Sequence, residues 1–395
     1  MKISFSGTSI KNITAAKIRD LNYFRLGDAL AVFSVDSSGG VGHLPNDPYQ
    51  CTSFQEGGFI IKVALVEMMC AGVRPVSIYL DFAFDRPDYL EEYLRGMRKE
   101  AADIGLTEIP IFVTHGTYRN PDCSAAGMSI FGVASESTLR INRSMPGDYV
   151  YAIGLPKFKN YVERMTTTAE IGRVLGLDYV HEVLPGGSHG IRHEAHALAK
   201  SNGLEFEEIE GTLLTDMAEL SCGAAATILV TVAPEDAEKL ENLDIRREIN
   251  RFGILHGNKE KSSPREKEDG IRAEVAESGD ITVDENWKIV SVPSVSYGAG
   301  LKEEDSRRDV AELDMELIRK SVSEMGEKKA EPLLVVNNFN FGMQPHGKEA
   351  IGKAGDMLRN EYGMNTETQF TGSTEDNFKT THSGIAVRVF GVSGV

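Results

Sequence analysis

An acidic residue beside a run of glycines is the first place in this sequence where chemistry can be expected. Asp36 follows the apolar run ALAVFSV, and Ser37, Gly39 and Gly40 come shortly after it. A carboxylate at the end of a strand can hold a magnesium ion, and glycines let backbone N–H groups approach a phosphate closely. The segment fits neither of the two common glycine-rich phosphate motifs, so a plain tight turn is the alternative.

Two further carboxylates in the same part of the chain could belong to such a metal site. Asp28 precedes the run ALAVFSV, and Asp81 lies near the end of the run VSIYLDF. Oxygen ligands at loops and strand ends are what a magnesium ion requires, although any one of them is more often a cap or a solvated turn residue. We predict that Asp28, Asp36 and Asp81 hold magnesium.

A second glycine-rich segment, PGGSHGIRHEAHALA at residues 185–199, leads directly into a predicted helix. Free N–H groups and the positive end of a helix dipole make such a loop a natural anion site. We therefore predict that Gly186 and Gly187 bind phosphate. His189 and His193 have the spacing of a zinc pair, provided that His189 is already helical. Solvated histidines beside a phosphate loop are the favoured interpretation.

A third candidate lies near the end of the sequence, where hydroxyls, a glycine and two acids occur together. Such a run could bind phosphate oxygens and a divalent ion at once. The residues expected to bind phosphate are Thr371, Gly372, Ser373, Thr374 and Asn377. The acids expected to bind the metal are Glu375 and Asp376.

Two long stretches of the sequence resemble each other. RPVSIYLDFAF begins at Arg74 and EPLLVVNNFNF begins at Glu331, and the same offset aligns residues 114–117 with residues 371–374. Self-similarity of this kind indicates a duplicated domain, with two unrelated α/β segments as the alternative. The first copy lacks the two acids, and the second lacks an equivalent of the Asp36 turn. Packing about a pseudo-twofold axis could combine the halves into one site.

The predicted elements follow this division of the chain. Short apolar runs of β type alternate with segments of helical periodicity, which predicts an α/β fold, more specifically an α+β sandwich. We predict a first domain over residues 1–145, a middle domain with the glycine-rich loop over 146–257, a charged linker over 258–270, and the second copy of the first domain over 271–395.

Charge and composition exclude several kinds of partner. The net charge of −17 and a pI near 5.1 argue against nucleic acid and anionic membranes. No apolar run reaches the roughly 18–20 residues that span a bilayer, and the start lacks the apolar region of a signal peptide. We expect a cytoplasmic protein. The spacing of Cys51, Cys70, Cys123 and Cys222 suits neither a zinc site nor a disulfide framework.

Several of these motifs resemble one family. The segment from Asp36 to Gly42, MCAGVRP and YLDFAF are similar to the amino-terminal domain of the aminoimidazole ribonucleotide synthetase superfamily, which includes thiamine-monophosphate kinase and selenophosphate synthetase. MPGDYV and LPGGSHG resemble its carboxy-terminal domain, and TGSTEDN resembles its glycine-rich loop in the form of α-ribazole kinase-like members. The resemblance covers nearly the whole chain. Glu67 stands where the family commonly has aspartate, and Tyr118 where an acid is usual.

The resemblance implies two amino-terminal-type domains that pair their sheets, with ATP and Mg²⁺ between them. It implies an enzyme that transfers the γ-phosphoryl group of ATP to a small molecule, with a ribosyl nucleoside such as α-ribazole as the first expectation. A synthetase that forms an acyl- or iminophosphate is the alternative enzyme, and a nucleotide-binding scaffold without turnover is the alternative from another class. We expect a monomer with an internal pseudo-dimer, or a homodimer. The catalytic residues are not identified by the sequence.

Overall fold

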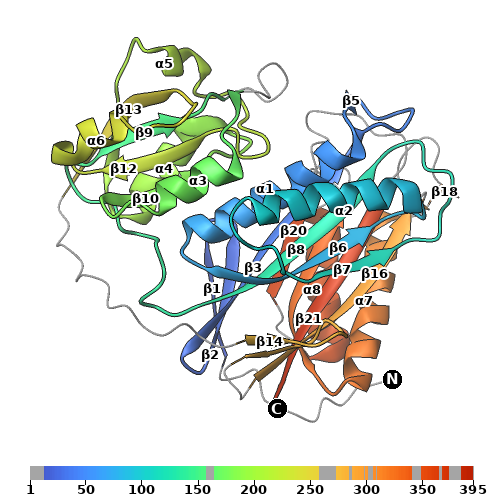
Figure 1. Cartoon of the computed structure of the whole chain (residues 1–395). Helices are drawn as coiled ribbons and strands as arrows, with labels where there is room; N and C mark the ends of the chain where they lie inside the picture. The colour runs from blue at the N-terminus through green and yellow to red at the C-terminus, as the bar shows by residue number, and fades with distance from the viewer. Residues whose placement is uncertain are drawn as a thin grey trace.

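The computed structural model describes residues 13–156, 164–257, 273–283, 287–297, 299–300, 306–307, 309–339, 348–363, 367–372 and 384–394. Two six-stranded sheets lie together in one part of the molecule, and a smaller α/β unit with a five-stranded sheet lies beside them (Figure 1). None of the helices in the described ranges is both long and apolar enough to cross a membrane.

The first copy is a sheet with strand order β1-β2-β3-β8-β6-β7 and two helices, α1 and α2. Neighbouring strands are antiparallel, except that β6 and β7 are parallel. Helix α1 starts at a capping box between Thr52 and Gln55, which satisfies free N–H groups of its first turn. The bounds are β1 Thr14–Ile18, β2 Leu21–Leu26, β3 Ala29–Gly39, β4 Val41–Gly42, β5 Tyr49–Gln50, α1 Ser53–Cys70, β6 Arg74–Phe82, α2 Pro87–Ala102, β7 Ile111–His115 and β8 Ala125–Ala134.

The second copy repeats this arrangement element for element. Its sheet has the order β14-β15-β16-β21-β19-β20, again with a single parallel pair, β19 and β20. Helices α1 and α7 both have 18 residues, and strands β3 and β16 both have 11. The bounds are β14 Ala273–Val275, β15 Ile281–Val283, β16 Trp287–Tyr297, β17 Ala299–Gly300, β18 Ser306–Arg307, α7 Val310–Glu327, β19 Glu331–Phe339, α8 Lys348–Tyr362, β20 Glu367–Gly372 and β21 Gly384–Gly394. The predicted duplication is confirmed.

The two sheets pack face to face, as predicted, through one shared apolar core. Successive side chains of a strand point to opposite faces, so Leu30 and Val32 of β3 pack under the helices while Ala31 and Phe33 face the other copy. The Phe33 ring lies 4.7 Å from the Phe390 ring of β21, centroid to centroid. Burial on both faces explains why β3, β6, β19 and β21 read as nearly continuous apolar runs.

The middle unit is an antiparallel sheet with strand order β10-β12-β9-β13-β11. It attaches to α1 of the first copy, whose Val66 and Cys70 join its core, and Lys62 of α1 donates a hydrogen bond to the Thr166 carbonyl. The bounds are β9 Tyr149–Ile153, α3 Thr168–Leu175, β10 Val180–Pro185, α4 Gly190–Ser201, β11 Glu205–Glu208, α5 Leu213–Met217, β12 Ile228–Val232, a 3-10 turn Pro234–Asp236, α6 Ala237–Glu241 and β13 Ile249–His256.

One local feature differs from the sequence-based expectation. Strand β3 continues to Gly39, because its pairing with β8 runs from Leu30 to Gly39, so Asp36 lies inside the strand and not at its end. Residues 14–26 form the hairpin of β1 and β2. The proposed domain boundaries at residues 145, 257 and 270 stay predictions.

Candidate functional site

The structure places the three predicted metal ligands of the first copy in three different environments. Asp28 is exposed in the turn between β2 and β3. Eight residues of extended strand separate it from Asp36, or roughly 26 Å at about 3.3 Å per residue. Asp36 shares the helix-covered face of the sheet with Leu30 and Val32, whereas Asp81 faces the second copy. Asp28, Asp36 and Asp81 therefore cannot share one metal ion.

Asp81 is held by a cation of the second copy. Its two carboxylate oxygens accept hydrogen bonds from Arg388 of β21, at 3.0 Å from Nε and 2.6 Å from Nη2. The Asp81 side chain is fully buried. Burial raises the pKa of Asp81, and the Arg388 guanidinium opposes that shift. The structure thus places Asp81 in an ion pair, which corrects its expected place in an open metal site.

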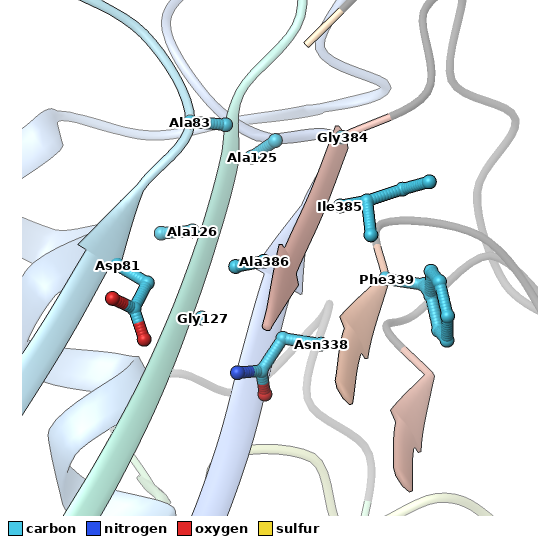
Figure 2. A pocket seen from close by; sticks show the side chains of 10 residues that line it. All are labelled: Asp81, Ala83, Ala125, Ala126, Gly127, Asn338, Phe339, Gly384, Ile385 and Ala386. Atoms are coloured by element: carbon cyan, nitrogen blue, oxygen red, sulfur yellow. The ribbon is translucent and has the colours of Figure 1, made fainter. Parts of the chain in front are cut away.

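A small cavity lies beside this ion pair, between β6 and β8 of one copy and β19 and β21 of the other. Figure 2 shows Asp81 and Asn338 on either side of Gly127. The cavity is about the size of one water molecule, too small for a nucleotide. A Cβ atom at Gly127 would come within 2.5 Å of the Asn338 side chain, so the two sheets are in close contact here.

The glycine turn after Asp36 is closed by hydrogen bonds within the protein. Gly40 has a left-handed φ of 67°, and its N–H donates to the Ser124 carbonyl at 3.1 Å. The Ser124 hydroxyl accepts from the Val41 N–H at 3.0 Å. The Ser37 N–H donates to the Asp36 carboxylate. The amide of Gly40 is therefore already used, and so are those of Ser37 and Val41.

Four carboxylates lie within electrostatic range of one another where the first copy adjoins the middle unit, and we call them the carboxylate cluster. They come from the β1–β2 turn, β3, α1 and α4, and are Asp20, Asp36, Glu67 and Glu194. Burial, together with nearby Asp20, raises the pKa of both Asp36 and Glu194 to about 7. Burial, Asp20 and Asp36 raise the pKa of Glu67 well above its usual range. Raised pKa values show that these acids resist ionisation where they lie, and a cation beside them would favour their charged forms.

The geometry of the cluster follows from strand alternation. Ser34 and Asp36 are two residues apart on β3, so both side chains point toward α1. There the Ser34 hydroxyl donates to Glu67 at 3.0 Å. Across the described ranges, no three His, Cys, Asp or Glu side chains converge closely enough to hold a metal ion by themselves. Magnesium commonly takes only one or two protein carboxylates together with phosphate oxygens and water, and the cluster fits that mode of binding.

The second glycine segment lies against the same cluster. Gly186 and Gly187 connect β10 to α4, and the Gly187 N–H donates to the Glu194 carboxylate. A Cβ at Gly186 would lie 2.7 Å from the Cys222 sulfur, and one at Gly187 would lie 2.5 Å from Glu194. Gly186 thus has no room for a side chain, and a side chain at Gly187 would displace the Glu194 carboxylate. The predicted phosphate loop of the middle unit thus contacts Glu194, which lies within electrostatic range of Glu67, as Asp36 does.

The histidines of this segment are arranged as solvated side chains and not as a shared metal site. His189 precedes α4 and His193 lies in its first turn, with ring centroids 5.1 Å apart and both residues exposed. The two side chains belong to the solvent-facing start of the helix, which agrees with the favoured interpretation of solvated histidines.

The third candidate is only partly within the described residues. Thr371 and Gly372 end β20 and pair with Asn338 and Phe339 of β19. Ser373, Thr374, Glu375, Asp376 and Asn377 lie outside the described residues.

Two residues between the first copy and the middle unit belong to no recognisable sequence motif. Arg19 and Asp20 form the β1–β2 turn, and Arg19 donates to the buried carboxylate of Glu182 on β10. Glu182 also accepts from the backbone N–H groups of residues 142, 143 and 144, and from Asn202 at 2.8 Å. This contact holds Asp20 beside the middle unit. It joins residues more than 160 positions apart, so no motif could reveal it.

No protein-family model matches the sequence, and no curated protein sequence matches it. Solved structures do match the fold. PurL from Thermotoga maritima complexed with ATP superposes with a TM-score of 0.60 at 12% identity, covering 97% of this chain and 74% of that chain. The complex of that PurL with FGAR gives 0.56 at 13% identity, covering 98% and 76%. Phosphoribosylformylglycinamidine synthase II from Thermotoga maritima gives 0.56 at 11% identity, covering 98% and 75%.

These likenesses extend over nearly the whole chain, so they include both copies of the duplicated sheet and the middle unit. At this level of identity they concern the fold, and the carboxylate cluster has to be interpreted from its own geometry. The expected architecture is confirmed: this chain has the fold of PurL from Thermotoga maritima.

Proposed function

We propose that this chain is an ATP- and Mg²⁺-dependent enzyme that transfers a phosphoryl group to a small molecule at the carboxylate cluster. The observation that carries the proposal is that Glu194, which accepts a hydrogen bond from the Gly187 amide, lies within electrostatic range of Glu67, as Asp36 of the first copy does. Phosphoryl transfer needs positioned phosphates and neutralised charge more than it needs a reactive side chain. A glycine loop can position the phosphates, and a Mg²⁺ ion held by the acids would neutralise their charge.

Asp36 and Glu67 are the residues proposed to hold magnesium, with Glu194 within electrostatic range of Glu67. Burial is the main cause that raises the pKa of Glu67, and Asp20 and Asp36 add to it, so a divalent cation there would favour the ionised carboxylates. The ion would supply charge neutralisation for the transferred phosphoryl group. The Gly186–Gly187 loop and the start of α4 are proposed to contact phosphate oxygens.

The second copy is proposed to complete the site through the segment TGSTEDN at residues 371–377. Its acids are absent from the first copy, so one nucleotide site per chain is expected. A ribosyl nucleoside such as α-ribazole is the proposed acceptor, on the strength of this segment's form. A synthetase that forms an acyl- or iminophosphate is the alternative enzyme, and the likeness to PurL favours it. A cytoplasmic location belongs to the same proposal.

A nucleotide-binding scaffold without turnover is the second candidate function. One observation favours it: Asp81, which the sequence assigned to a magnesium ion, is paired with Arg388 instead. A site with fewer metal ligands can bind a nucleotide without transferring its phosphoryl group. The phosphoryl-transfer proposal rests on the carboxylate cluster, which this observation does not affect.

Calorimetric titration with a non-hydrolysable ATP analogue, with Mg²⁺ or with EDTA, tests the site. Asp36→Asn and Glu67→Gln are each expected to weaken Mg²⁺-dependent binding by about tenfold or more, because each removes a charge-assisted ligand. Asp28→Asn is the matched control, since Asp28 is exposed and far along the strand. Unchanged affinity in both cluster variants would contradict the site. ADP release with a panel of nucleosides separates enzyme from scaffold, since a scaffold binds the analogue but releases no ADP.

A further inference from the structure

We propose that Asp81 and Arg388 form a one-sided charge lock, so that the inner face of each copy fits the unlike copy and rejects a copy of its own kind. The proposal concerns how the two halves recognise each other and is independent of the activity proposed above. It rests on the contrast between two positions related by the duplication, one charged and one neutral.

The charged position is fully satisfied. Arg388 is 2% exposed and Asp81 is 0% exposed. Besides its two bonds to Asp81, the guanidinium donates to the Ser291 hydroxyl at 3.1 Å and to the Thr114 hydroxyl at 3.3 Å. It also lies 4.8 Å from the centroid of the Tyr79 ring. A planar guanidinium that pairs with both oxygens of a carboxylate has the geometry of a strong buried pair.

Strand register identifies the neutral counterpart. Asp81 of β6 pairs with Gly127 of β8, and in the other copy Asn338 of β19 pairs with Ala386 of β21. Likewise Arg388 pairs with Val336, as Ser129 pairs with Tyr79. Asn338 thus takes the place of Asp81, and Ser129 takes the place of Arg388. Figure 2 shows Asp81 and Asn338 on either side of Gly127.

The neutral residues Asn338 and Ser129 need no charged partner. Asn338 is 3% exposed and Ser129 is 0% exposed. Within the described residues, the amide atoms of Asn338 and the hydroxyl of Ser129 have no hydrogen-bond partner. Neutral polar groups of this kind cost far less to bury than an isolated ion does. The interface therefore carries its ionic pair on one side of the pseudo-twofold axis only.

Pairing of like copies would separate the two charges. Two first-copy faces would set Asp81 against Ser129 twice, which buries two carboxylates without a cation. Two second-copy faces would set Arg388 against Asn338 twice, which buries two guanidinium groups without an anion. A buried charge left without its partner costs several kcal/mol. Only the pairing of a first copy with a second copy brings the Asp81 carboxylate to the Arg388 guanidinium.

A double-mutant cycle on the full-length chain tests the lock. Arg388→Met keeps most of the volume beside Tyr79 but leaves Asp81 as a lone buried carboxylate. Asp81→Asn leaves Arg388 without its anion. Each single variant is expected to lower the folding equilibrium constant by about 100-fold or more in urea unfolding. The double variant, which has a neutral pair like the one on the other side, is expected to recover most of that loss.

Arg319→Met with Glu361→Gln is the matched control cycle, because that pair joins α7 to α8 on the surface. Little coupling is expected there. If a single lock variant does not fold, the soluble yields of the single and double variants are compared instead, and the double should be the more soluble. Additive losses in the Asp81–Arg388 cycle, or a double variant no more soluble than the singles, would overturn the proposal.

Discussion

The Tyr297 hydroxyl of the second copy donates a 2.7 Å hydrogen bond to the Cys123 carbonyl of the first copy. Cys123 is followed by Ser124, whose carbonyl and hydroxyl hold the N–H groups of Gly40 and Val41. One copy therefore fixes the turn that follows Asp36 in the other. This contact gives the second copy a direct effect on the geometry of the first.

Removal of that hydroxyl should loosen the turn. Tyr297→Phe keeps the ring and loses a hydrogen bond worth about 1 kcal/mol. We expect faster amide hydrogen exchange at residues 40–49, measured by mass spectrometry, with little change in the helices. Tyr362→Phe on α8, which packs on the opposite side of the second copy, is the control. Equal exchange at residues 40–49 in both variants would show that the contact is incidental.

A buried acid in the second copy should make stability depend on pH. Burial raises the pKa of Asp314 from 3.8 to about 8, and the Asn337 amide donates to its Oδ2 at 2.9 Å. The folded state holds this proton more tightly than the unfolded state. The contribution of Asp314 to stability is therefore fully present below pH 4 and is lost as pH rises toward 8.

Asp314→Asn should remove this dependence. An amide at residue 314 can keep the bond from Asn337 and donate to the Asn337 Oδ1, which has no partner among the described residues. Relative to wild type, the variant should gain stability between pH 4 and pH 8, on the order of 3–5 kcal/mol in total. Urea unfolding across that range measures the difference. A constant difference between the two proteins would mean that Asp314 is ionised in the folded state.

The contact between the sheets should not tolerate a methyl group at Gly127. The added Cβ would come within 2.5 Å of Asn338, and overpacking of this kind costs about 1–3 kcal/mol. Gly352→Ala is a matched control, because Gly352 lies in α8 with nothing within 4 Å of the added atom. That change should stabilise the helix by up to about 1 kcal/mol. Thermal unfolding distinguishes the two, and equal shifts would show that the sheets are not in tight contact.

The two copies are expected to provide one nucleotide site per chain. Glu375→Gln and Asp36→Asn should damage the same activity non-additively, as residues of one phosphate–metal unit do. Titration with the ATP analogue should saturate at one equivalent per chain. A stoichiometry of two, or independent losses in the double variant, would show that each copy works alone.

The duplication was predictable because strands buried on both faces leave long apolar runs that can be compared by eye, as at Arg74 and Glu331. The placement of Asp36 near the middle unit was only partly predictable. Both Asp36 and the Gly186–Gly187 loop are recognisable in the sequence, but the contact between Arg19 of the β1–β2 turn and Glu182 of β10 is not.

The role of Asp81 was not predictable from its neighbours. An acid near the end of a buried strand suggests a metal ligand, and its actual partner, Arg388, lies 307 residues away. Alternation along β3 and β6 places Asp36 and Asp81 on opposite faces of one sheet. That placement could have been derived only if the pairing registers of β3 and of β6 with β8 had been known.

Because the two sheets that share a core belong to one chain, their pairing does not depend on protein concentration. In a dimer of separate subunits, dilution releases the subunits, so stability depends on protein concentration. Here both faces belong to one chain, and the tether keeps the second copy at a high effective concentration beside the first. The unfolding midpoint of the paired sheets should thus stay the same from nanomolar to micromolar protein. A single molecule suffices to build the pair, however scarce the protein becomes.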